Sequence, residues 1–321
     1  MFGMILKFQA FLEKLKQNKR VWFTTLTLIS FLGIIGTISY LNTTTSRAAQ
    51  NLYEATSTNY FLEIDSKSNK TVESITLLGI ALLENPNFVA ILNNQNNVAG
   101  INEQLKSIAS KINKPDQTPI ALELYNKDGI KIASSLADAR LNSTPSDSKV
   151  LERVLISNEM NSGIEYDDGQ VYFRAFFPVG NGVLETKKSL NFLVDDYAEG
   201  NKIFQVLMDK DFLDMKNVQR YPFKKIGKGE ISVQSTVDDD FLEKITELNF
   251  DEILEKKYIL TEENFILAKP IMNVDNKRIG MILISENILQ DGSLPNMTKS
   301  ITTGITTAAL GLVVALLVLM I

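Results

Sequence analysis

Two long apolar stretches, Val21 to Thr45 and Ile301 to Ile321, lie at the two ends of the chain, and neither contains a charged side chain. Each is long enough for a helix across a bilayer core, which takes about 20 apolar residues. We therefore predict transmembrane helices over 21–45 and 297–321, with a polar segment between them. A cleaved signal peptide is the alternative for the first stretch, although its apolar run is longer than a usual signal core and no small-residue cleavage site follows it.

The charges before the first stretch predict its orientation. Residues 1–20 contain one acid, Glu13, and the basic side chains Lys7, Lys14, Lys16, Lys19 and Arg20. Basic clusters of this kind stay on the cytoplasmic side of a membrane. We therefore expect a cytoplasmic tail over 1–20 and a protein that crosses the membrane twice, with residues 46–298 outside the cytoplasm.

Helical periodicity continues after the first stretch. Residues 42–84 contain no Pro and a single Gly, Gly79, and apolar side chains recur every three to four residues at Val72, Ile75, Leu78 and Leu82. This pattern predicts a long helix, which Asn85 and Pro86 end or kink. A second amphipathic helix should follow, closed by Lys114 and Pro115. Its apolar face is formed by Ile101, Leu105, Ile108 and Ile112.

From Ile120 onward the pattern changes to strands. Residues 121–125 and 130–133 predict a hairpin around an Asp-Gly turn at 126–129. The rest of this half should contain a short helix over 146–157, a turn at 167–169, an aromatic-rich strand over 171–179 and a last strand over 203–208.

The segment after Lys228 repeats this order in shorter form. We expect a strand over 230–235, a helix over 238–254 and strands over 258–260, 265–272 and 278–285. The buried face of the helix should contain Phe241, Ile245, Leu248 and Ile253. In this repeat, residues 173–179 correspond to 265–272, and residues 204–212 to 281–289. Two similar α+β modules in tandem are the expected architecture.

The composition excludes several classes of function. The chain has no Cys and no His, which removes disulfides, most zinc ligand sets and the usual pairs of nucleophile and base. Serine-hydrolase motifs and phosphate-binding glycine loops are also absent from the sequence, so we expect no enzyme activity. The net charge is -5, without a basic stripe, which argues against a nucleic-acid partner. The acidic groups at 167–168, 195–196 and 238–240 do not have calcium-loop spacing, so we expect neither a metal nor a cofactor.

Two segments resemble a known family: Leu122 to Ser135, LELYNKDGIKIASS, and Gly169 to Val179, GQVYFRAFFPV. Together with the order of span, long helix, two modules and span, they resemble the double Cache sensor domain of bacterial chemoreceptors, sensor histidine kinases and cyclic-dinucleotide enzymes. The resemblance covers residues 42–289. It implies an α+β fold of two tandem PAS-like antiparallel sheet modules on a long N-terminal helix, flanked by two transmembrane helices.

We accordingly divide the chain into consecutive parts. They are a cytoplasmic tail (1–20), transmembrane helix 1 (21–45), the long helix and a helical connection (46–115), a membrane-distal module (116–225), a membrane-proximal module (226–296) and transmembrane helix 2 (297–321).

The resemblance implies that the membrane-distal module binds a small ligand. Arg174 is the main candidate contact, flanked by Tyr172 and Phe176 on the same strand face, because a guanidinium suits a carboxylate or phosphate. The alternative is that Arg174 extends from a sheet edge into solvent while the aromatic side chains form core. Weaker candidates are Tyr125, Arg153 and Asp209; a solvated role is the alternative for Arg153 and helix capping for Asp209. The chain lacks the arrangement of Tyr, Arg and Trp with a partnering Asp that amino-acid-binding members of the family show, which argues against an α-amino acid ligand.

These observations favour the sensing portion of a receptor in the bacterial inner (plasma) membrane, most of all a methyl-accepting chemotaxis protein. The sensor portion of a histidine kinase or diguanylate cyclase is a close variant, and a non-sensing, membrane-anchored envelope interaction protein is the alternative from another class. The expected partners are a small-molecule ligand such as an organic anion, the membrane, a second copy in a homodimer, and a cytoplasmic output domain or signalling protein.

Overall fold

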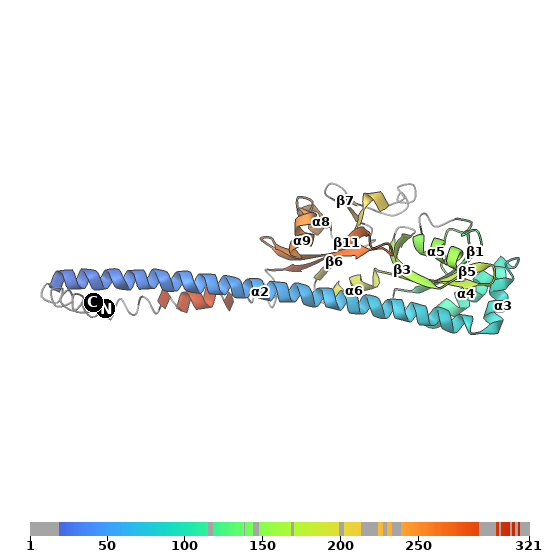
Figure 1. Ribbon diagram of the computed structural model, residues 1–321, viewed down its shortest axis with the longest axis horizontal. Helices are drawn as coiled ribbons and strands as arrows, with labels where there is room; N and C mark the ends of the chain where they lie inside the picture. The colour runs from blue at the N-terminus through green and yellow to red at the C-terminus, as the bar shows by residue number, and fades with distance from the viewer. Residues whose placement is uncertain are drawn as a thin grey trace. The chain divides into compact units, whose positions relative to one another are not determined.

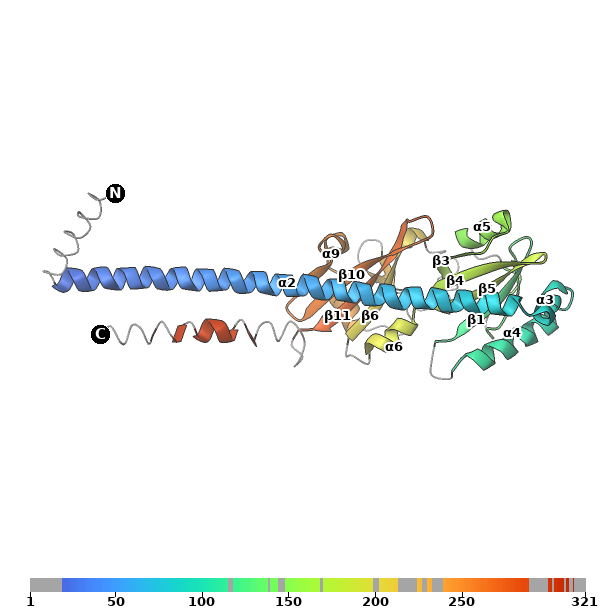
Figure 2. The ribbon, with the colours of Figure 1, turned by 60° about the horizontal axis from the view of Figure 1, so that its bottom comes forward.

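The computed structural model describes residues 19–114, 118–137, 139–143, 148–167, 170–198, 202–212, 224–226, 230–232, 239–288, 300–301, 303–308, 310–311 and 314. The chain divides into two compact units, Met1–Ala55 with Leu289–Ile321 and Thr56–Ile288. The contacts discussed below lie within Thr56–Ile288, which contains both β-sheets (Figures 1 and 2).

Helix α2 extends over Lys19–Leu83, which confirms the predicted long helix. It ends before Asn85, whose side chain accepts hydrogen bonds from the backbone N–H groups of Asn87 and Phe88 and so begins α3 (Pro86–Asn93). Pro86 fits the first turn of α3 because no intrahelical hydrogen bond is required there. Residues 1–18 of the predicted cytoplasmic tail (1–20) lie outside the described residues, so α2 is described from Lys19.

Helix α4 (Val98–Ile112) is the second predicted amphipathic helix. Ile101 and Leu105 are buried, as expected, and Ala109 completes the buried face. The prediction is wrong for Ile112, which is 37% exposed, because the helix ends at this residue and its last turn extends past the covered surface.

The transmembrane helices stay predictions. Among the residues that the structure describes, a single helix with both the length and the apolar composition for crossing a bilayer is not found. The segments Thr43–Leu83 and Pro86–Asn93, bent by 86° at their junction, reach that length and composition only when taken together.

The first sheet has five antiparallel strands, in the spatial order β2-β1-β5-β4-β3. They are β1 (Ile120–Asn126), β2 (Lys131–Ser134), β3 (Asn161–Asp167), β4 (Gln170–Val179) and β5 (Gly182–Ser189). The predicted hairpin is confirmed as β1 and β2, with Gly129 at a φ of 73° in its turn, and the predicted strand over 171–179 is confirmed as β4. The sequence analysis predicts neither β3 nor β5.

Helices cover both faces of the first sheet. On one face lies α2, where the hydroxyl of Thr186 donates a hydrogen bond of 2.8 Å to the carbonyl of Ile75. On the other face lies α5 (Lys149–Ser157), capped by Ser148; residues 146–147 of the predicted helix are outside the described residues. The apolar cluster beneath α5 consists of Tyr125, Val150, Leu151, Val154, Phe176 and Val183.

The second sheet has six strands, in the order β7-β8-β6-β11-β10-β9. They are β6 (Lys202–Asp209), β7 (Lys224–Ile226), β8 (Glu230–Ser232), β9 (Tyr258–Leu260), β10 (Asn264–Met272) and β11 (Arg278–Asn287). Helix α6 (Phe192–Ala198) precedes β6, and the short 3-10 helix η1 (Lys210–Phe212) follows it. The strands predicted over 258–260, 265–272 and 278–285 are confirmed; residues 233–235 of the predicted 230–235 strand lie outside the described residues.

The single helix predicted over 238–254 is wrong. The segment forms two helices, α8 (Asp239–Ile245) and α9 (Phe250–Lys256). The break occurs because the side chain of Asn249 accepts a hydrogen bond from the backbone of Glu252 and starts a new helix. Both helices pack on one face of the second sheet, and the expected apolar side chains face it, three of them buried and Leu248 partly buried.

Strand β6 corrects the predicted division between the modules. The sequence analysis assigns 203–208 to the first module as its closing strand, but β6 pairs with β8 and β11 in the second sheet. The last strand of the first sheet in chain order is β5, which lies in the middle of that sheet. The correspondence of 204–212 with 281–289 is therefore wrong, because these segments are neighbours in one sheet. Alternating apolar residues predict a strand, but its partner is chosen by segments far away in the chain.

The two sheets nevertheless share one order and one register. Without the edge strand β7, the second sheet reads β8-β6-β11-β10-β9, the same pattern as β2-β1-β5-β4-β3. Gly182 and Gly280 match, because a Cβ on either would lie 2.3 Å from a backbone carbonyl oxygen of the neighbouring strand. Pro178 and Pro270 also match. Pro178 pairs with Val183 of β5, and Pro270 pairs with Met281 of β11; these partners directly follow Gly182 and Gly280 in the chain. This register confirms the predicted correspondence of 173–179 with 265–272.

Candidate functional site

Seven charged side chains are buried together in the first sheet, on the face that α5 partly covers. They are the cations Lys131, Arg174 and Lys187 and the anions Glu123, Glu165, Asp167 and Glu185, each at most 7% exposed; we call them the ion network. Removing so many charges from water costs about as much as their attraction returns. A buried cluster of this kind is therefore weak evidence for added stability, which makes it a candidate functional site.

Arg174 joins most of the acids of the ion network. Its Nε donates to Glu185 at 2.5 Å, its Nη1 to Glu165 at 3.2 Å and its Nη2 to the hydroxyl of Tyr125 at 3.3 Å. The ring of Phe176 lies 4.7 Å from its guanidinium carbon. The interpretation in which Arg174 extends from a sheet edge into solvent is wrong, because the side chain is fully buried and its three nitrogens already bind protein groups.

The two lysines hold the remaining acids. The Nζ of Lys187 lies 2.7 Å from Asp167 and 3.0 Å from Glu123, and the Nζ of Lys131 lies 2.8 Å from Glu123. The hydroxyl of Tyr125 lies 2.8 Å from both Glu123 and Glu185. Tyr125 therefore connects the lysine side of the ion network to the arginine side.

These contacts set the protonation of the acids. Burial acts to raise the pKa of Glu123, but the ammonium groups of Lys187 and Lys131 outweigh burial and bring this pKa down to about 2. At Asp167 burial is likewise outweighed by Lys187 and Arg174, and the pKa lies below its usual value. At Glu185 burial prevails over Arg174, so the pKa is raised. Glu185 consequently takes up a proton more readily than Glu123 or Asp167.

Glu165 connects the ion network to helix α5. One of its carboxylate oxygens accepts a hydrogen bond of 2.6 Å from the hydroxyl of Ser148, and the other accepts a hydrogen bond of 3.1 Å from the backbone N–H of Val150. Because the first N–H groups of a helix have no intrahelical partner, Glu165 satisfies one of them while it also binds Arg174. A rearrangement of the ion network would therefore reach the start of α5.

Among the residues that the structure describes, the second sheet buries no ion network. By the shared register, Glu123 corresponds to Gln205, Arg174 to Ile266, Glu185 to Leu283 and Lys187 to Ser285. Ile266 and Leu283 belong to the apolar core beneath α8 and α9. The same arrangement of strands is thus compatible with uncharged side chains, and the charges of the first sheet are not a requirement of this fold.

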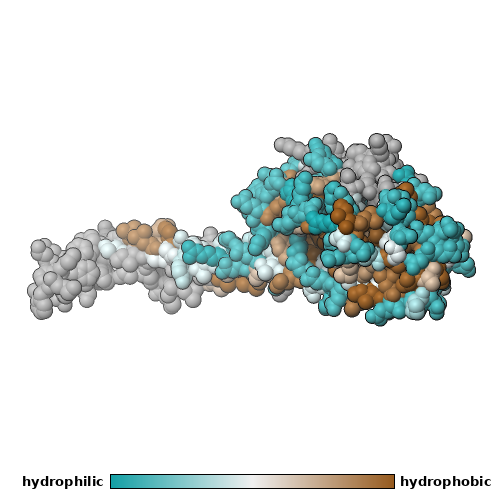
Figure 3. All heavy atoms as spheres, turned by 45° about the vertical axis from the view of Figure 1, so that its right-hand side comes forward, coloured by the Kyte–Doolittle hydropathy of each residue, from teal (hydrophilic) through white to brown (hydrophobic). Residues whose placement is uncertain are grey.

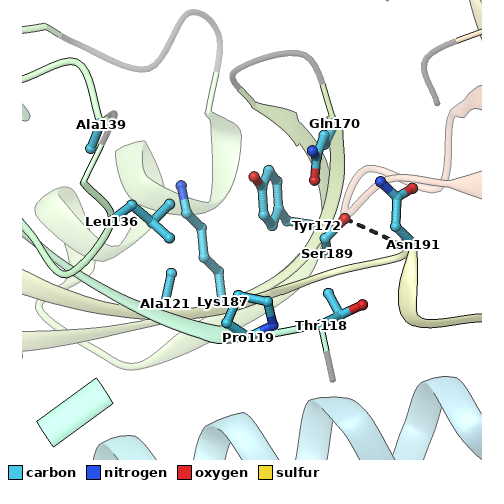
Figure 4. Close-up of a pocket in the computed structure, with 10 residues that line it drawn as sticks. All are labelled: Thr118, Pro119, Ala121, Leu136, Ala139, Gln170, Tyr172, Lys187, Ser189 and Asn191. Atoms are coloured by element: carbon cyan, nitrogen blue, oxygen red, sulfur yellow. Dashed lines mark hydrogen bonds between the residues drawn. The ribbon is translucent and has the colours of Figure 1, made fainter. Parts of the chain in front are cut away.

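A hollow of about 300 Å³ lies beside the ion network, at the lower end of the range for small-molecule sites. We call it the first-sheet hollow. Figure 4 shows its lining: Thr118, Pro119, Ala121, Leu136, Ala139, Gln170, Tyr172, Lys187, Ser189 and Asn191. Lys187 is the one charged residue of this described lining, and its Nζ lies 4.7 Å from the centre of the Tyr172 ring. Lys187 therefore belongs to both the hollow and the ion network.

The structure brings together some of the predicted site residues and separates the others. Tyr172 lines the first-sheet hollow, and Tyr125 and Phe176 lie beside Arg174, their ring centroids 6.0 Å apart. Arg153 is exposed on α5 and pairs with Asp275 in the turn between β10 and β11. Asp209 lies at the end of β6 in the second sheet, 3.4 Å from Arg278. The roles of all these residues toward a ligand stay predictions.

The sequence analysis does not single out Lys187, Glu185 or Glu123. Strand β5 reads GVLETKKS, and a segment with this many charges is more typical of an exposed loop than of a buried strand. The spacing of the charges could have indicated a buried ion pair. Glu185 and Lys187 are two residues apart and opposite in charge, so a strand would place both on one face.

Comparisons with known proteins do not assign this chain to a family. The chain matches no protein-family model and no curated protein. Among solved structures, the extracellular domain of an inferred histidine kinase, vpHK1S-Z8, has a TM-score of 0.43 and 12% identity over 75% of this chain and 98% of that chain. The periplasmic domain of LuxQ from Vibrio cholerae has a TM-score of 0.32 and 11% identity over 76% and 99%. An extracellular ligand binding receptor from Desulfohalobium retbaense has a TM-score of 0.29 and 8% identity over 68% and 40%. At these scores the likenesses carry no argument about function.

Proposed function

We propose that this chain is the extracytoplasmic sensing portion of a bacterial transmembrane receptor and that the first-sheet hollow binds a small organic anion. The observation that carries the proposal is the double position of Lys187, which belongs to the described lining of the hollow and whose ammonium group also balances Asp167 and Glu123. The apolar stretches at both ends and the resemblance to double Cache domains support the receptor role. A methyl-accepting chemotaxis protein is the receptor class we favour, with a histidine kinase or a cyclase as the variant.

An anion suits the first-sheet hollow better than a cation does. Lys187 is the one charged residue of the described lining, whereas Asp167 and Glu123 do not belong to this lining and already bind the lysine. The polar groups of Gln170, Ser189 and Asn191 can orient an anion's remaining oxygens. At about 4 Å, a unit charge near a protein surface attracts an ammonium group by about 4 kcal/mol, so a bound anion opposes the attraction of Asp167 and Glu123, which lie nearer to the Nζ of Lys187.

This competition provides a way to signal. A ligand shifts a conformational equilibrium only by the difference in its affinity for the two states. An anion that draws Lys187 away from Asp167 and Glu123 binds better to the state in which the ion network has rearranged. Thr186 neighbours Lys187 in β5 and donates its hydrogen bond to Ile75 on α2, so a displacement of β5 acts directly on that helix.

A homodimer formed through α2 belongs to the same proposal. Leu62, Leu77 and Ile80 are exposed on this helix, at 62%, 58% and 41%. The face drawn in Figure 3 is mainly hydrophilic, with separate apolar patches. Exposed apolar side chains on one helix are suited to contact with a second copy of that helix.

The test is thermal unfolding of the full chain in detergent micelles with acetate, succinate, citrate and benzoate, and with putrescine for comparison. We expect the melting temperature to rise with the logarithm of the concentration of at least one anion, by about 5–10 °C at a hundred times its Kd. Gln170→Leu and Tyr172→Phe should reduce this rise while the protein stays folded, and Lys187→Met should abolish it.

Lys256→Ala is the matched control, because it removes an exposed lysine from the second sheet's helix α9 and should leave the anion effect unchanged. An equal rise in the wild type and in Gln170→Leu and Tyr172→Phe would place the anion elsewhere. No rise with any anion would favour the alternative of a non-sensing protein that docks to envelope partners.

A further inference from the structure

A second hollow, of about 230 Å³, lies in the second sheet. We call it the second-sheet hollow, and its lining is Ile203, Asp240, Phe241, Lys244, Glu263, Asn264, Ser285 and Asn287. By the shared register, Asn264, Ser285 and Asn287 correspond to Tyr172, Lys187 and Ser189, all of which line the first-sheet hollow. Both sheets are therefore hollowed at the same place, although their side chains there are different.

Ser285 is a buried residue of the second-sheet hollow whose hydroxyl lacks a hydrogen-bond partner within the described structure. The residue is 1% exposed. A buried hydroxyl without a partner is unfavourable, and native proteins supply one as a protein group, a water molecule or a ligand. Because Ser285 lines the hollow, an occupant of the hollow is the group that can satisfy it.

The backbone at two lining residues, Asn264 and Asn287, is held in place independently of any occupant. The backbone N–H of Asn264 donates to the hydroxyl of Thr261 at 2.9 Å, and this hydroxyl donates back to the carbonyl of Asn264 at 3.1 Å. Asn264 also pairs with Asn287 across β10 and β11. These backbone contacts fix the positions from which both carboxamides reach the hollow, and fixed polar groups are typical of specific sites.

The charges of the lining select the class of ligand. Lys244 binds Glu263 at 2.5 Å, so its charge is compensated, and Asp240 adds a further negative charge. Two acids against one base repel an anion. The hydroxyl, the two carboxamides and the carboxylates together offer both hydrogen-bond donors and acceptors, as a compound with several hydroxyl groups requires, and Phe241 offers an apolar surface for its carbon skeleton.

We propose that the second-sheet hollow binds a small uncharged polyhydroxyl compound of the size of a pentose or hexose, through the hydroxyl of Ser285 and the carboxamides of Asn264 and Asn287. This would be a second site, independent of the anion site proposed for the first sheet, and would give the two modules different ligand classes. The volume of the second-sheet hollow lies below the usual range for drug-sized ligands, which matches a small sugar or polyol.

The test measures thermal unfolding of the full chain in detergent micelles with D-ribose, D-glucose, D-xylose and glycerol at increasing concentration. We expect a rise in melting temperature with at least one of them. Ser285→Ala should weaken the apparent affinity about tenfold, as expected for the loss of one hydrogen bond, and Asn264→Ala should weaken it by a similar factor. Ser285→Ala removes only an oxygen atom that has no partner, so the unliganded protein should melt no lower than the wild type.

Two controls locate the effect. Ser74→Ala removes an exposed serine on α2 and should leave the polyol effect unchanged. Tyr172→Phe alters the first-sheet hollow and should also leave it unchanged. If none of the four compounds raises the melting temperature, the second-sheet hollow holds water only and the proposal fails. It fails as well if Ser285→Ala responds to the compounds as the wild type does. Neither result bears on the anion site, which is tested with other compounds.

Discussion

At the scale of single residues, the ion network is a set of groups that depend on one another. Arg174 binds Glu185 and Glu165 and approaches Asp167 at 3.6 Å. Taking away its guanidinium would leave Lys131 and Lys187 to balance all four acids. A buried charge that loses its partner costs far more than the pair contributes, so the single residue matters mainly through the charges it leaves behind.

Arg174→Ile should lower the free energy of unfolding by about 3–5 kcal/mol, as measured by urea denaturation. The double variant Arg174→Ile with Glu185→Leu should recover at least half of this loss. It introduces the side chains that Ile266 and Leu283 place at the corresponding positions of the second sheet, and it removes an acid together with the base that it binds.

The control for this prediction is Arg153→Ile, which breaks an exposed pair with Asp275 and should cost less than about 1 kcal/mol. A double variant no more stable than Arg174→Ile alone would contradict the view that the cost lies in uncompensated charge.

At the scale of elements, α2 is shared by the two sheets. It contacts the first through the hydrogen bond from Thr186 to Ile75 and the second through Asp65, whose carboxylate lies 2.8 Å from the Nζ of Lys269. Gly79 is a further close contact, because a Cβ at this position would lie 2.2 Å from the ring of Phe177. A helix in contact with both sheets is the element through which one module can act on the other.

Gly79→Ala should destabilise the protein although alanine is the better helix former. The higher helix propensity contributes about 1 kcal/mol, but the added methyl group must displace the buried ring of Phe177, and overpacking costs about 1–3 kcal/mol. We expect a net loss of about 1 kcal/mol in urea denaturation. Ser74→Ala, at an exposed position of α2, serves as the control for propensity alone and should raise stability slightly; an increase for Gly79→Ala would show that α2 is not in close contact with β4.

At the scale of the whole molecule, the chain joins two sheets of one topology that differ in what they bury. The first sheet buries the ion network, and the second buries an apolar core between its strands and helices α8 and α9. Since β6 starts the second sheet directly after α6, the connection between the modules is short. The two modules therefore share one topology and differ in the chemistry of the side chains that they bury.

The predicted membrane topology is testable because the chain has no cysteine, so an introduced thiol is unique. Glu159→Cys, at an exposed position after α5, should react with a membrane-impermeant maleimide in intact spheroplasts. Lys7→Cys, in the predicted cytoplasmic tail, should react only after the membrane is permeabilised. The wild-type chain is the blank for both. Labelling of Lys7→Cys in intact spheroplasts would contradict the predicted orientation.

Local patterns accounted for most of the elements. The long helix that ends before Asn85, the hairpin of β1 and β2, and strands β4, β9, β10 and β11 follow from periodicity and turn residues, which act over a few neighbouring positions. Strand β5 was not predicted, because its many charged residues are typical of a loop. These charges can be buried only because other strands supply their partners.

By itself, the sequence determined the α+β class, the tandem repeat, the lack of cysteine and histidine, and the position of Tyr172, Arg174 and Phe176 on one strand face. Only the tertiary structure decided that β6 belongs to the second sheet, that Arg174 lies inside an ion network, and that Lys187 and Ser285 line hollows at matching places. The physical reason is range: periodicity is set by adjacent residues, whereas strand partners and the compensation of buried charge are set by segments that meet only in the folded chain.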